Sequence, residues 1–335
     1  MINDFSEIVQ KLGTDVHKFE NSNVAITGSN GLLGRYLSLS FLEMKNKCLV
    51  YGIDNGTFDK NKIIKNKYMK YLWKDVSKNK LNCDVDYVFH CASIASPVHY
   101  KSREIQILET AYQGTKNILE WARKKDVKGV LNFSSSEVYS DPEIIPTPET
   151  YVGKINTLGP RSAYDVGKLV VETLSYTYYK NYGIPITIVR PFNCFGKFMR
   201  VDDGRAIPNM VFKALKYQPI VIHGNGLQSR TFCYASDATS GFIQACINGK
   251  RGEAYNIGTQ SPEISMAHLT EEIGNILGRK LQVEFIQDKD VYKYQPNRRC
   301  PDVSKAVKDF GYAPSVTLRD GLTRFIDWAK LNETK

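Results

Sequence analysis

The sequence predicts an α/β protein, with a Rossmann-type doubly wound parallel sheet followed by a smaller, mixed α/β C-terminal domain. Three observations carry this prediction. Short β-branched runs alternate with helical apolar spacing up to about residue 190, a glycine-rich turn at 28–34 joins the first run to the first helix, and the alternation loosens after Pro191. A chain of 335 residues is long enough for about two domains.

The elements follow in chain order from the periodicity of apolar residues. Residues 1–22 form an N-terminal extension with a short amphipathic helix that contains Phe5, Ile8, Val9 and Leu12. Strands are predicted at 23–27, 48–53, 86–90, 127–134 and 185–190, and a third strand precedes Asp75. Helices are predicted at 32–44, 105–125, 162–182, 208–217, 237–248, 266–277 and 318–331, with short strands between the last four.

Composition excludes several classes of protein. Apolar residues make up 42% of the chain and charged residues 24%, as in soluble globular proteins. No apolar stretch approaches the roughly 20 residues that cross a bilayer, and the N-terminus lacks the regions of a secretory signal, so we expect no membrane association. The seven cysteines are odd in number and form no CxxC pair, which favours a reducing, cytoplasmic location and disfavours a structural metal.

The net charge of +10 raises the question of a nucleic-acid partner. Much of the excess is lysine scattered among asparagines, as between residues 60 and 74, and no nucleic-acid-binding motif accompanies it. We therefore expect no nucleic acid. A small substrate that bears phosphate groups would also suit a positive field.

The first chemical motif is the turn Gly28-Ser29-Asn30-Gly31-Leu32-Leu33-Gly34. Glycines let the backbone approach a pyrophosphate, and the helix that follows offers unpaired N–H groups to it. Asp54 comes 20 residues after Gly34, at the end of the second strand, where a carboxylate suits ribose hydroxyls and repels a 2′-phosphate. The predicted cofactor is therefore NAD, bound by Gly28, Asn30, Gly31, Leu33, Gly34 and Asp54, with Asp75 and Val76 placed to contact adenine or to form an ordinary turn.

The second motif is Tyr164 with Lys168 on a predicted helix. Residues four apart share one helix face, and an ammonium beside a phenol lowers the pKa of the phenol, so the pair predicts a general acid/base. The third motif is Ser134-Ser135-Ser136-Glu137, which follows a strand at the edge where open α/β sheets bind ligands.

Together these residues resemble the extended short-chain dehydrogenase/reductase superfamily, and within it the enzymes that modify nucleotide sugars. The resemblance runs from about Asn23 to Leu331. It is most similar to the UDP-glucuronate decarboxylases, also called UDP-xylose synthases. The segments that carry it are 90–97, Ser-Glu-Val-Tyr at 136–139, Gly-Pro-Arg at 159–161, 192–196, Asp-Gly-Arg at 203–205 and 229–232.

The resemblance implies roles for single residues. Tyr164 would take the proton of the sugar 4-hydroxyl, Lys168 would hold the nicotinamide ribose, Ser135 would bind the 4-oxygen and Glu137 would assist at the sugar ring. Ala92 would contact the cofactor. Ser136, Tyr151, Asn193, Arg205, Arg230 and Arg299 would hold the nucleotide sugar. The NAD-binding domain would span 23–190, segments near 228–260 would return to it, and 191–335 would mainly form the substrate domain; by analogy the protein would be a homodimer.

Several positions depart from that pattern. Val166 and Val152 stand where the decarboxylases usually have Glu and Trp, and Lys197-Phe198 replaces the usual Pro-Arg. The expected activity is decarboxylation of UDP-glucuronate, with 4,6-dehydration or 4-epimerisation of a nucleotide sugar as alternatives. A catalytically silent nucleotide-binding protein is the alternative from a different class; the intact Ser135, Tyr164 and Lys168 disfavour it.

Overall fold

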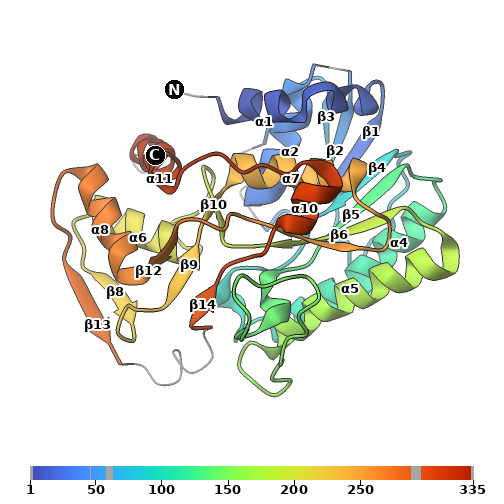
Figure 1. The fold of residues 1–335 in the computed structure, drawn as a ribbon. Coiled ribbons are helices and arrows are strands. Elements are labelled where there is room, and N and C mark those ends of the chain that lie inside the picture. The colour runs from blue at the N-terminus through green and yellow to red at the C-terminus, as the bar shows by residue number, and fades with distance from the viewer. Residues whose placement is uncertain (1–2, 46, 58–62, 288–295, 333–335) are drawn as a thin grey trace.

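The computed structural model describes residues 3–45, 47–57, 63–287 and 296–332. Its centre is a seven-stranded sheet in the order β11-β6-β5-β4-β1-β2-β3, in which all neighbours run parallel (Figure 1). The strands are β1 (Asn23–Thr27), β2 (Leu49–Asp54), β3 (Met69–Trp73), β4 (Tyr87–His90), β5 (Gly129–Phe133), β6 (Ile186–Pro191) and β11 (Ala254–Ile257). The predicted doubly wound Rossmann-type fold is confirmed.

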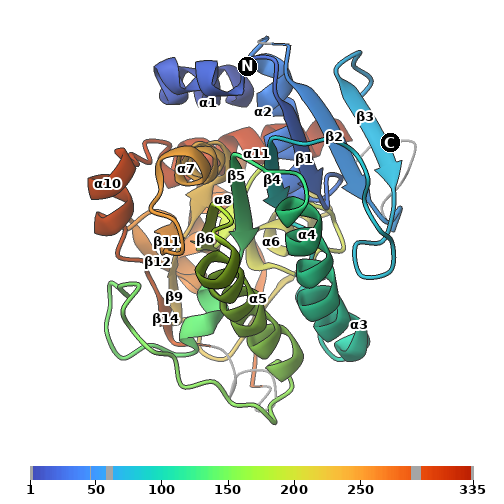
Figure 2. The same ribbon diagram turned by 90° about the vertical axis from the view of Figure 1, so that its right-hand side faces the viewer.

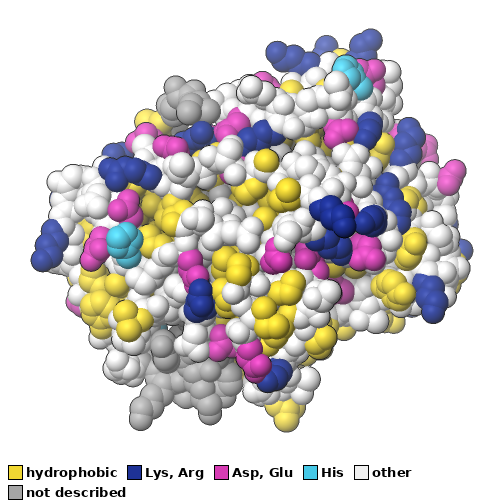
Figure 3. All heavy atoms as spheres, in the orientation of Figure 1, with side chains coloured by type: hydrophobic (Ala, Val, Ile, Leu, Met, Phe, Trp, Pro, Cys, Tyr) yellow, Lys and Arg dark blue, Asp and Glu magenta, His cyan; other side chains and the backbone are white. Residues whose placement is uncertain are grey.

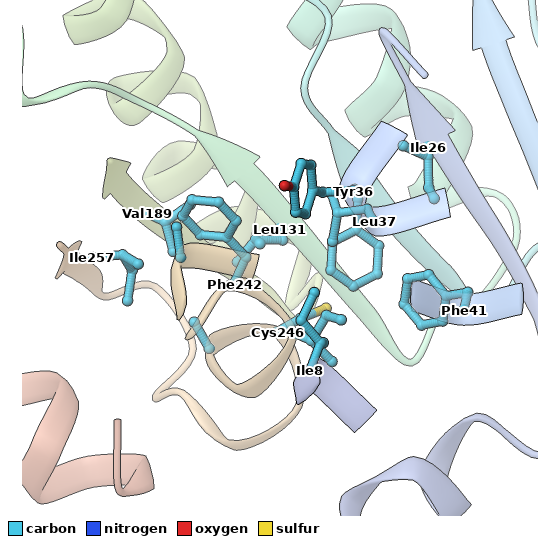
Figure 4. Close-up of a cluster of buried hydrophobic side chains, with 14 of the residues drawn as sticks. Ile8, Ile26, Tyr36, Leu37, Phe41, Leu131, Val189, Phe242, Cys246 and Ile257 are labelled. Atoms are coloured by element: carbon cyan, nitrogen blue, oxygen red, sulfur yellow. The ribbon is translucent and has the colours of Figure 1, made fainter. Parts of the chain in front are cut away.

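Helices cover both faces of this sheet, which is why its central strands are buried apolar runs. One face packs against α2 (Leu32–Glu43) and α7 (Ala235–Asn248). The other packs against α4 (Thr115–Arg123) and α5 (Ser162–Tyr182), and α3 (Glu104–Glu109) lies beside α5 (Figure 2). Figure 4 shows the core on the first face, where the helix side chains Ile8, Phe41 and Phe242 and the strand residue Leu131 belong to one buried cluster.

The helix predicted at 105–125 is divided in the structure. A π turn, Thr110–Gly114, separates α3 from α4. Gly114 lies in this turn beside Val76, and a Cβ at Gly114 would come within 3.1 Å of the Val76 Cγ2 atom. A π turn changes the hydrogen-bond pattern without ending the helix, so the segment resembles one continuous helix in its sequence.

The C-terminal part lies beside the carboxyl ends of the large sheet (Figure 1). Its helices are α6 (Ala206–Leu215), α8 (Met266–Leu277) and α11 (Leu318–Asn332), whereas α10 (Ser304–Phe310) packs against α7 and β11. Its short strands are β7 (Cys194–Phe195), β8 (Ile220–His223), β9 (Ser229–Thr231), β10 (Cys233–Tyr234), β12 (Glu263–Ser265), β13 (Val283–Ile286) and β14 (Arg298–Arg299). The ends of α8 follow local rules: the Ser265 hydroxyl accepts from the His268 N–H, and Gly278 ends the helix at φ 69°.

The N-terminal helix α1 (Asp4–Leu12) packs against α2 and α7. Its Asp4 is fully buried and accepts hydrogen bonds from the hydroxyls of Tyr36 at 2.7 Å and Tyr234 at 2.9 Å. The Lys197 ammonium lies 3.2 Å from the same carboxylate. Because a buried carboxylate needs such partners, α1 is tied to both parts of the chain.

Basic side chains do not gather into one patch on the face of the molecule shown in Figure 3, where lysines and arginines are interspersed with aspartates and glutamates. None of the helices in the described parts of the chain combines the length and hydrophobicity that crossing a bilayer requires.

Candidate active site

The glycine-rich turn forms a narrow cradle between β1 and α2. Gly28 adopts φ +65°, which favours glycine, and its N–H donates to the Ile53 carbonyl at 2.8 Å. A Cβ on Gly34 would come 2.2 Å from the Gly28 carbonyl oxygen, so only glycine lets the helix start this close to the turn. Gly31 caps α2 without a side-chain hydrogen bond and leaves the first N–H groups of the helix open to a ligand.

Two side chains of the turn have no hydrogen-bond partner among the described residues. They are the Ser29 hydroxyl and the side-chain amide of Asn30, and both are buried. The Asp54 carboxylate, at the end of β2, accepts from the N–H groups of Asn30 at 3.2 Å and Gly56 at 3.0 Å. Burial raises the pKa of Asp54, and these two donors oppose the rise. Turn, helix end and carboxylate together fit an adenine dinucleotide with free ribose hydroxyls.

Asp75 and Val76 follow β3 in a local turn. The Asp75 carboxylate accepts from the N–H of Ser77 at 2.9 Å and from its hydroxyl at 2.6 Å, and Val76 is buried in the core beside α4. The Asp75 side chain is thus used by the turn, and a role for these two residues toward adenine stays a prediction.

Ala92 and Leu33 border the cradle from two sides. The Ala92 N–H donates to the Thr27 hydroxyl at 3.0 Å, and a Cβ on Gly28 would lie 3.0 Å from the Ala92 Cα. Leu33 is half-buried in the first turn of α2 and packs against the core. The structure therefore brings Ala92, Gly28 and α2 together.

Tyr164 and Lys168 lie on one face of α5, and both are buried. The Lys168 Nζ atom donates to the Phe133 carbonyl at 2.8 Å and lies 5.6 Å from the centre of the Tyr164 ring. Burial lowers the pKa of Lys168 to about 8, although Cys91 and Glu172 favour its charged form.

Groups other than Lys168 also act on the pKa of the Tyr164 phenol, and the expected effect of Lys168 on this phenol stays a prediction. Burial raises the pKa of Tyr164 to about 12; a hydrogen bond with Ser135 lowers it, Glu137 raises it and Arg205 lowers it. The ammonium is engaged with the Phe133 carbonyl, and desolvation disfavours the charged forms of both groups.

Tyr100, which the sequence analysis did not single out, covers Tyr164. The two rings stack at 4.7 Å between centres with 18° between their planes. The Arg161 guanidinium lies over the Tyr100 ring, 5.5 Å from its centre. Stacking of this kind restricts the motion of the Tyr164 phenol and shields it from water.

The loop after β5 carries the hydroxyl and carboxyl groups of the third motif. It forms a 3₁₀ turn, Ser136–Tyr139, with Ser135 as its N-cap. The Ser135 Oγ atom accepts from the Glu137 N–H at 3.2 Å and interacts with the Tyr164 hydroxyl. The predicted Ser135 and Tyr164 therefore lie side by side.

Glu137 is surrounded by arginines from distant parts of the chain. One Glu137 oxygen pairs with Arg161, and the other lies 3.2 Å from the Arg299 Nη1 atom. Burial alone would raise the pKa of Glu137, but Arg299, Arg161 and Arg230 outweigh it, so the pKa lies below its ordinary value. Glu137 is thus ionised and held within a cationic cluster.

Arg299 is the most enclosed member of this cluster, with 2% of its surface exposed. It donates to the Ser136 hydroxyl and to the Ser140 carbonyl, each at 2.9 Å. Strand pairing places Arg299 of β14 directly beside Arg230 of β9. The pairing brings the predicted Arg230 and Arg299 together, and the side chain of Arg299 joins them to Ser136 and Glu137.

Arg230 and Arg299 repel each other. Burial and the adjacent Arg299 together lower the pKa of Arg230 to about 10, against the opposing effect of Glu137. The Arg230 guanidinium donates to the carbonyls of Pro296 at 2.6 Å and Ser229 at 2.7 Å. Two cations held this close form a site that an anion would stabilise.

Two further predicted residues lie near this site. Arg205 precedes α6, forms a two-point ion pair with Asp203 and favours ionisation of Tyr164. Asn193 adopts φ 39° after β6, and its Nδ2 atom donates to the Thr231 carbonyl at 3.0 Å, next to Arg230.

Tyr151 is not joined to the cluster by any interaction among the described residues. Its hydroxyl accepts from the Glu143 N–H at 3.2 Å, and its ring packs against Val138, Tyr139 and Phe192. The structure therefore places Tyr151 in a small apolar cluster behind the loop, and a contact with a sugar carboxylate stays a prediction.

Sequence reasoning missed Arg161 and Asp165 as site residues. The Arg161 Nε atom lies 3.9 Å from an oxygen of Asp165, which follows one helical turn later. The Nη2 atom of the same arginine pairs with Glu137. Burial and the nearby Glu137 raise the pKa of Asp165 to about 7, against the opposing effect of Arg161 and Arg299. The spacing of Arg161 and Asp165 by four residues was an available signal.

Lys197 and Phe198, which replace the usual Pro-Arg of the decarboxylases, contact the N-terminal helix and its neighbours. Lys197 pairs with the buried Asp4, and the Phe198 ring packs edge-on against Tyr36 and Trp328. Both side chains thus join α1, α2 and α11 together.

Comparisons with known proteins agree with this geometry. The model of the NAD dependent epimerase/dehydratase family matches residues 24–258. UDP-glucuronic acid decarboxylase 3 of Arabidopsis thaliana is 34% identical over 305 residues, covering 90% of this chain and 87% of its own. UDP-glucuronic acid decarboxylase 1 of Xenopus tropicalis is 32% identical over 313 residues, covering 92% and 72%.

Solved structures show the same fold. The epimerase Mth375 of Methanothermobacter thermautotrophicus superposes with a TM-score of 0.84 at 23% identity, over 98% of this chain and 97% of its own. UDP-glucuronic acid 4-epimerase of Bacillus cereus, solved with UDP-glucuronic acid and NAD, superposes with a TM-score of 0.79 at 26% identity, over 92% and 99%. The chain belongs to the NAD dependent epimerase/dehydratase family, within the extended short-chain dehydrogenase/reductases.

Proposed function

We propose that this protein converts UDP-glucuronate to UDP-xylose by transient oxidation at C4 of the sugar followed by decarboxylation. The observation that carries the proposal is the cluster of Arg161, Arg230 and Arg299 around the carboxylate of Glu137, beside Tyr164. Three guanidinium groups face the carboxyl groups of Glu137 and Asp165, and the raised pKa of Asp165 leaves it only partly ionised near pH 7, so positive charge is in excess. That excess suits a substrate with several anionic groups, namely a diphosphate and a sugar carboxylate.

The residues of α5 and of the loop after β5 would handle the proton at the sugar 4-oxygen. Tyr164 accepts the proton of the 4-hydroxyl and returns it at the end, Ser135 holds the 4-oxygen, and Lys168 favours the ionised phenol. NAD, when bound, accepts hydride from C4 and gives it back, so that no second redox substrate is consumed. Gly28, Gly34 and Asp54 would hold it, together with Lys168 at the nicotinamide ribose.

Decarboxylation follows from the chemistry of the oxidised sugar. A ketone at C4 makes the sugar carboxylate a β-keto acid, which loses CO2 and leaves its electron pair on C5 as an enolate. The arginine cluster would stabilise negative charge that develops there, and protonation at C5 would give a 4-keto pentose. Return of the hydride to C4 and of the Tyr164 proton to the 4-oxygen would then complete the xylosyl group. Glu137, fixed between Arg161 and Arg299, would orient the sugar ring during these steps.

Epimerisation of UDP-glucuronate at C4 is the second candidate. It is supported by the structural similarity to the Bacillus cereus 4-epimerase, which binds the same acidic sugar. Dehydration is less well supported, because Ser136 stands where a dehydratase would have an acidic partner for Glu137, and Glu137 is itself ionised.

The finer assignments belong to the same proposal. Residues 23–190 with the segments near 228–260 would bind NAD, and 191–335 would mainly bind the nucleotide sugar. The odd number of cysteines and the lack of a CxxC pair favour a cytoplasmic location.

A homodimer would form through α3 and α5, which lie side by side on the surface in Figure 2 and expose Ile105, Leu108, Leu169 and Tyr176. Light scattering of the wild type and of Leu169→Glu tests this dimer.

The test of the activity is mass spectrometry of products after incubation with UDP-glucuronate, and in parallel with UDP-glucose, dTDP-glucose and UDP-galacturonate. Loss of CO2 from UDP-glucuronate, abolished in Tyr164→Phe, supports the proposal. Loss of water from a neutral hexose, or an isomer of UDP-glucuronate seen by chromatography without a change of mass, refutes it in favour of the alternatives. Absence of turnover with copurified NAD would favour a silent binding protein.

A further inference from the structure

We propose that Glu172 and Arg190 act as a positioning pair, which holds the loop Ser134–Tyr139 in register with Tyr164 and Lys168. Neither residue is part of the chemistry assigned above. The proposal rests on the proposed function in one respect, because it takes Ser135 and Glu137 within this loop as working residues.

The pair joins α5 to β6 through two parallel hydrogen bonds. The Arg190 Nε and Nη2 atoms donate to the two Glu172 oxygens, each at 2.7 Å. Both side chains are largely buried, with 13% and 15% of their side-chain surface exposed. A two-point pair of this kind fixes orientation as well as distance, since a planar guanidinium matches a carboxylate in one geometry.

Each end of the loop is attached to one member of the pair. At the start, the Ser134 hydroxyl donates to the Glu172 Oε1 atom at 2.5 Å. At the end, the Arg190 Nη1 atom donates to the Tyr139 hydroxyl at 2.7 Å, and that hydroxyl donates to the Asn256 Oδ1 atom at 2.7 Å. Ser135 and Glu137 lie between these two attachments, so their positions depend on the pair.

Helix geometry explains why Glu172 serves this purpose. Tyr164, Lys168 and Glu172 follow one another at intervals of four residues, which places all three along one face of α5. The first two face the site of reaction, and the third fixes the loop that must meet them. One rigid helix thereby sets the distance between the Ser135 hydroxyl and the Tyr164 phenol.

Glu172 has a second effect that makes the proposal measurable. Its charge favours the ammonium form of Lys168, in concert with Cys91 and against burial. The other charged or titratable neighbours of Lys168 are Tyr164 on the same helix and His90 at the end of β4. Loss of the Glu172 charge should therefore move the alkaline limb of kcat to lower pH, which a purely structural role would not do.

The test compares Glu172→Gln with Asp309→Asn. The control removes a carboxylate that also joins a cation and a hydroxyl, Lys250 and Tyr255, each at 2.8 Å, but that has no contact with the loop. We expect kcat of Glu172→Gln to fall by about 10- to 100-fold, as for a small misplacement of reacting groups, with KM within about twofold of the wild type. Hydrogen exchange of the peptide spanning 134–140 should accelerate in Glu172→Gln and stay unchanged in Asp309→Asn.

Ser134→Ala and Tyr139→Phe separate positioning from folding, because they cut the attachments and leave the ion pair in place. Each should lower kcat, and their effects should be non-additive with that of Glu172→Gln. The proposal is overturned if Glu172→Gln behaves as Asp309→Asn does, or if it lowers the melting temperature while kcat, pH limb and loop exchange stay those of the wild type. If the wild type turns over no nucleotide sugar, the proposed function fails, and loop exchange alone still decides on the positioning pair.

Discussion

Replacing Arg299 by methionine tests the electrostatic account of the site. Methionine fills the space of the apolar stem but removes a guanidinium that donates to Ser136 and Ser140 and pairs with Glu137. Breaking one partner of a buried ion pair costs about 3–5 kcal/mol in the free energy of unfolding, because the remaining charge stays buried. Arg299→Met also removes the repulsion between Arg299 and Arg230, so the loss in unfolding free energy at pH 7 should lie at the lower end of this range, about 3 kcal/mol.

The loss should depend on pH in a defined direction. In the wild type the arginines hold the pKa of Glu137 below its unfolded value, so this carboxylate stabilises the fold above that value and ceases to do so as pH falls through the folded pKa. In Arg299→Met burial is opposed only by Arg161 and Arg230, and the pKa of Glu137 rises. The difference between the two proteins should therefore be largest near pH 7 and shrink below about pH 4.

Urea unfolding at pH 7 and at lower pH measures both effects. Arg298→Met is the matched control, since Arg298 pairs with Glu263 on the surface and 55% of its side chain is exposed. A surface pair of this kind contributes about 0–1 kcal/mol. Equal losses for Arg298→Met and Arg299→Met at pH 7, or a loss for Arg299→Met that does not change with pH, would refute the reasoning.

Three further predictions concern single positions. Gly34→Ala would force a Cβ to 2.2 Å from the Gly28 carbonyl oxygen, so affinity for NAD should fall by at least about tenfold in a fluorescence titration. Lys168→Met should abolish turnover yet raise the unfolding free energy at pH 7 by about 1–2 kcal/mol. The reason is that a pKa of about 8 for Lys168 reflects roughly 3 kcal/mol of unfavourable burial, partly offset by one hydrogen bond. This gain should shrink above pH 8, where the lysine of the wild type is deprotonated in the folded state but still protonated in the unfolded state. Asp165→Asn should leave the unfolding free energy unchanged near pH 4 and raise it by on the order of 3 kcal/mol above pH 7. The reason is that a raised carboxyl pKa adds stability at low pH that is lost as pH rises through about 7. Chemical denaturation of both proteins across this range measures the effect, and a difference in unfolding free energy that does not change with pH would contradict the prediction.

Local rules explain why much of the architecture could be predicted. A strand, a glycine turn and a helix follow one another within 23–43, and their backbone requirements are met by neighbours in sequence. The helix 162–182 and the common face of Tyr164 and Lys168 likewise follow from the 3.6-residue period. The π turn at 110–114 was not predicted, because it changes the hydrogen-bond pattern within a helix without ending the helix.

The sequence by itself determined the doubly wound sheet, the dinucleotide cradle and the helix face with Tyr164, since each depends on residues close together in the chain. Only the tertiary structure decided which charges surround Glu137, because Arg161 and Arg299 arrive from a helix and a strand separated by well over a hundred residues. It also decided the raised pKa of Tyr164, because burial depends on the whole fold. Contacts and desolvation of this kind arise from packing between distant segments, and no local pattern encodes them.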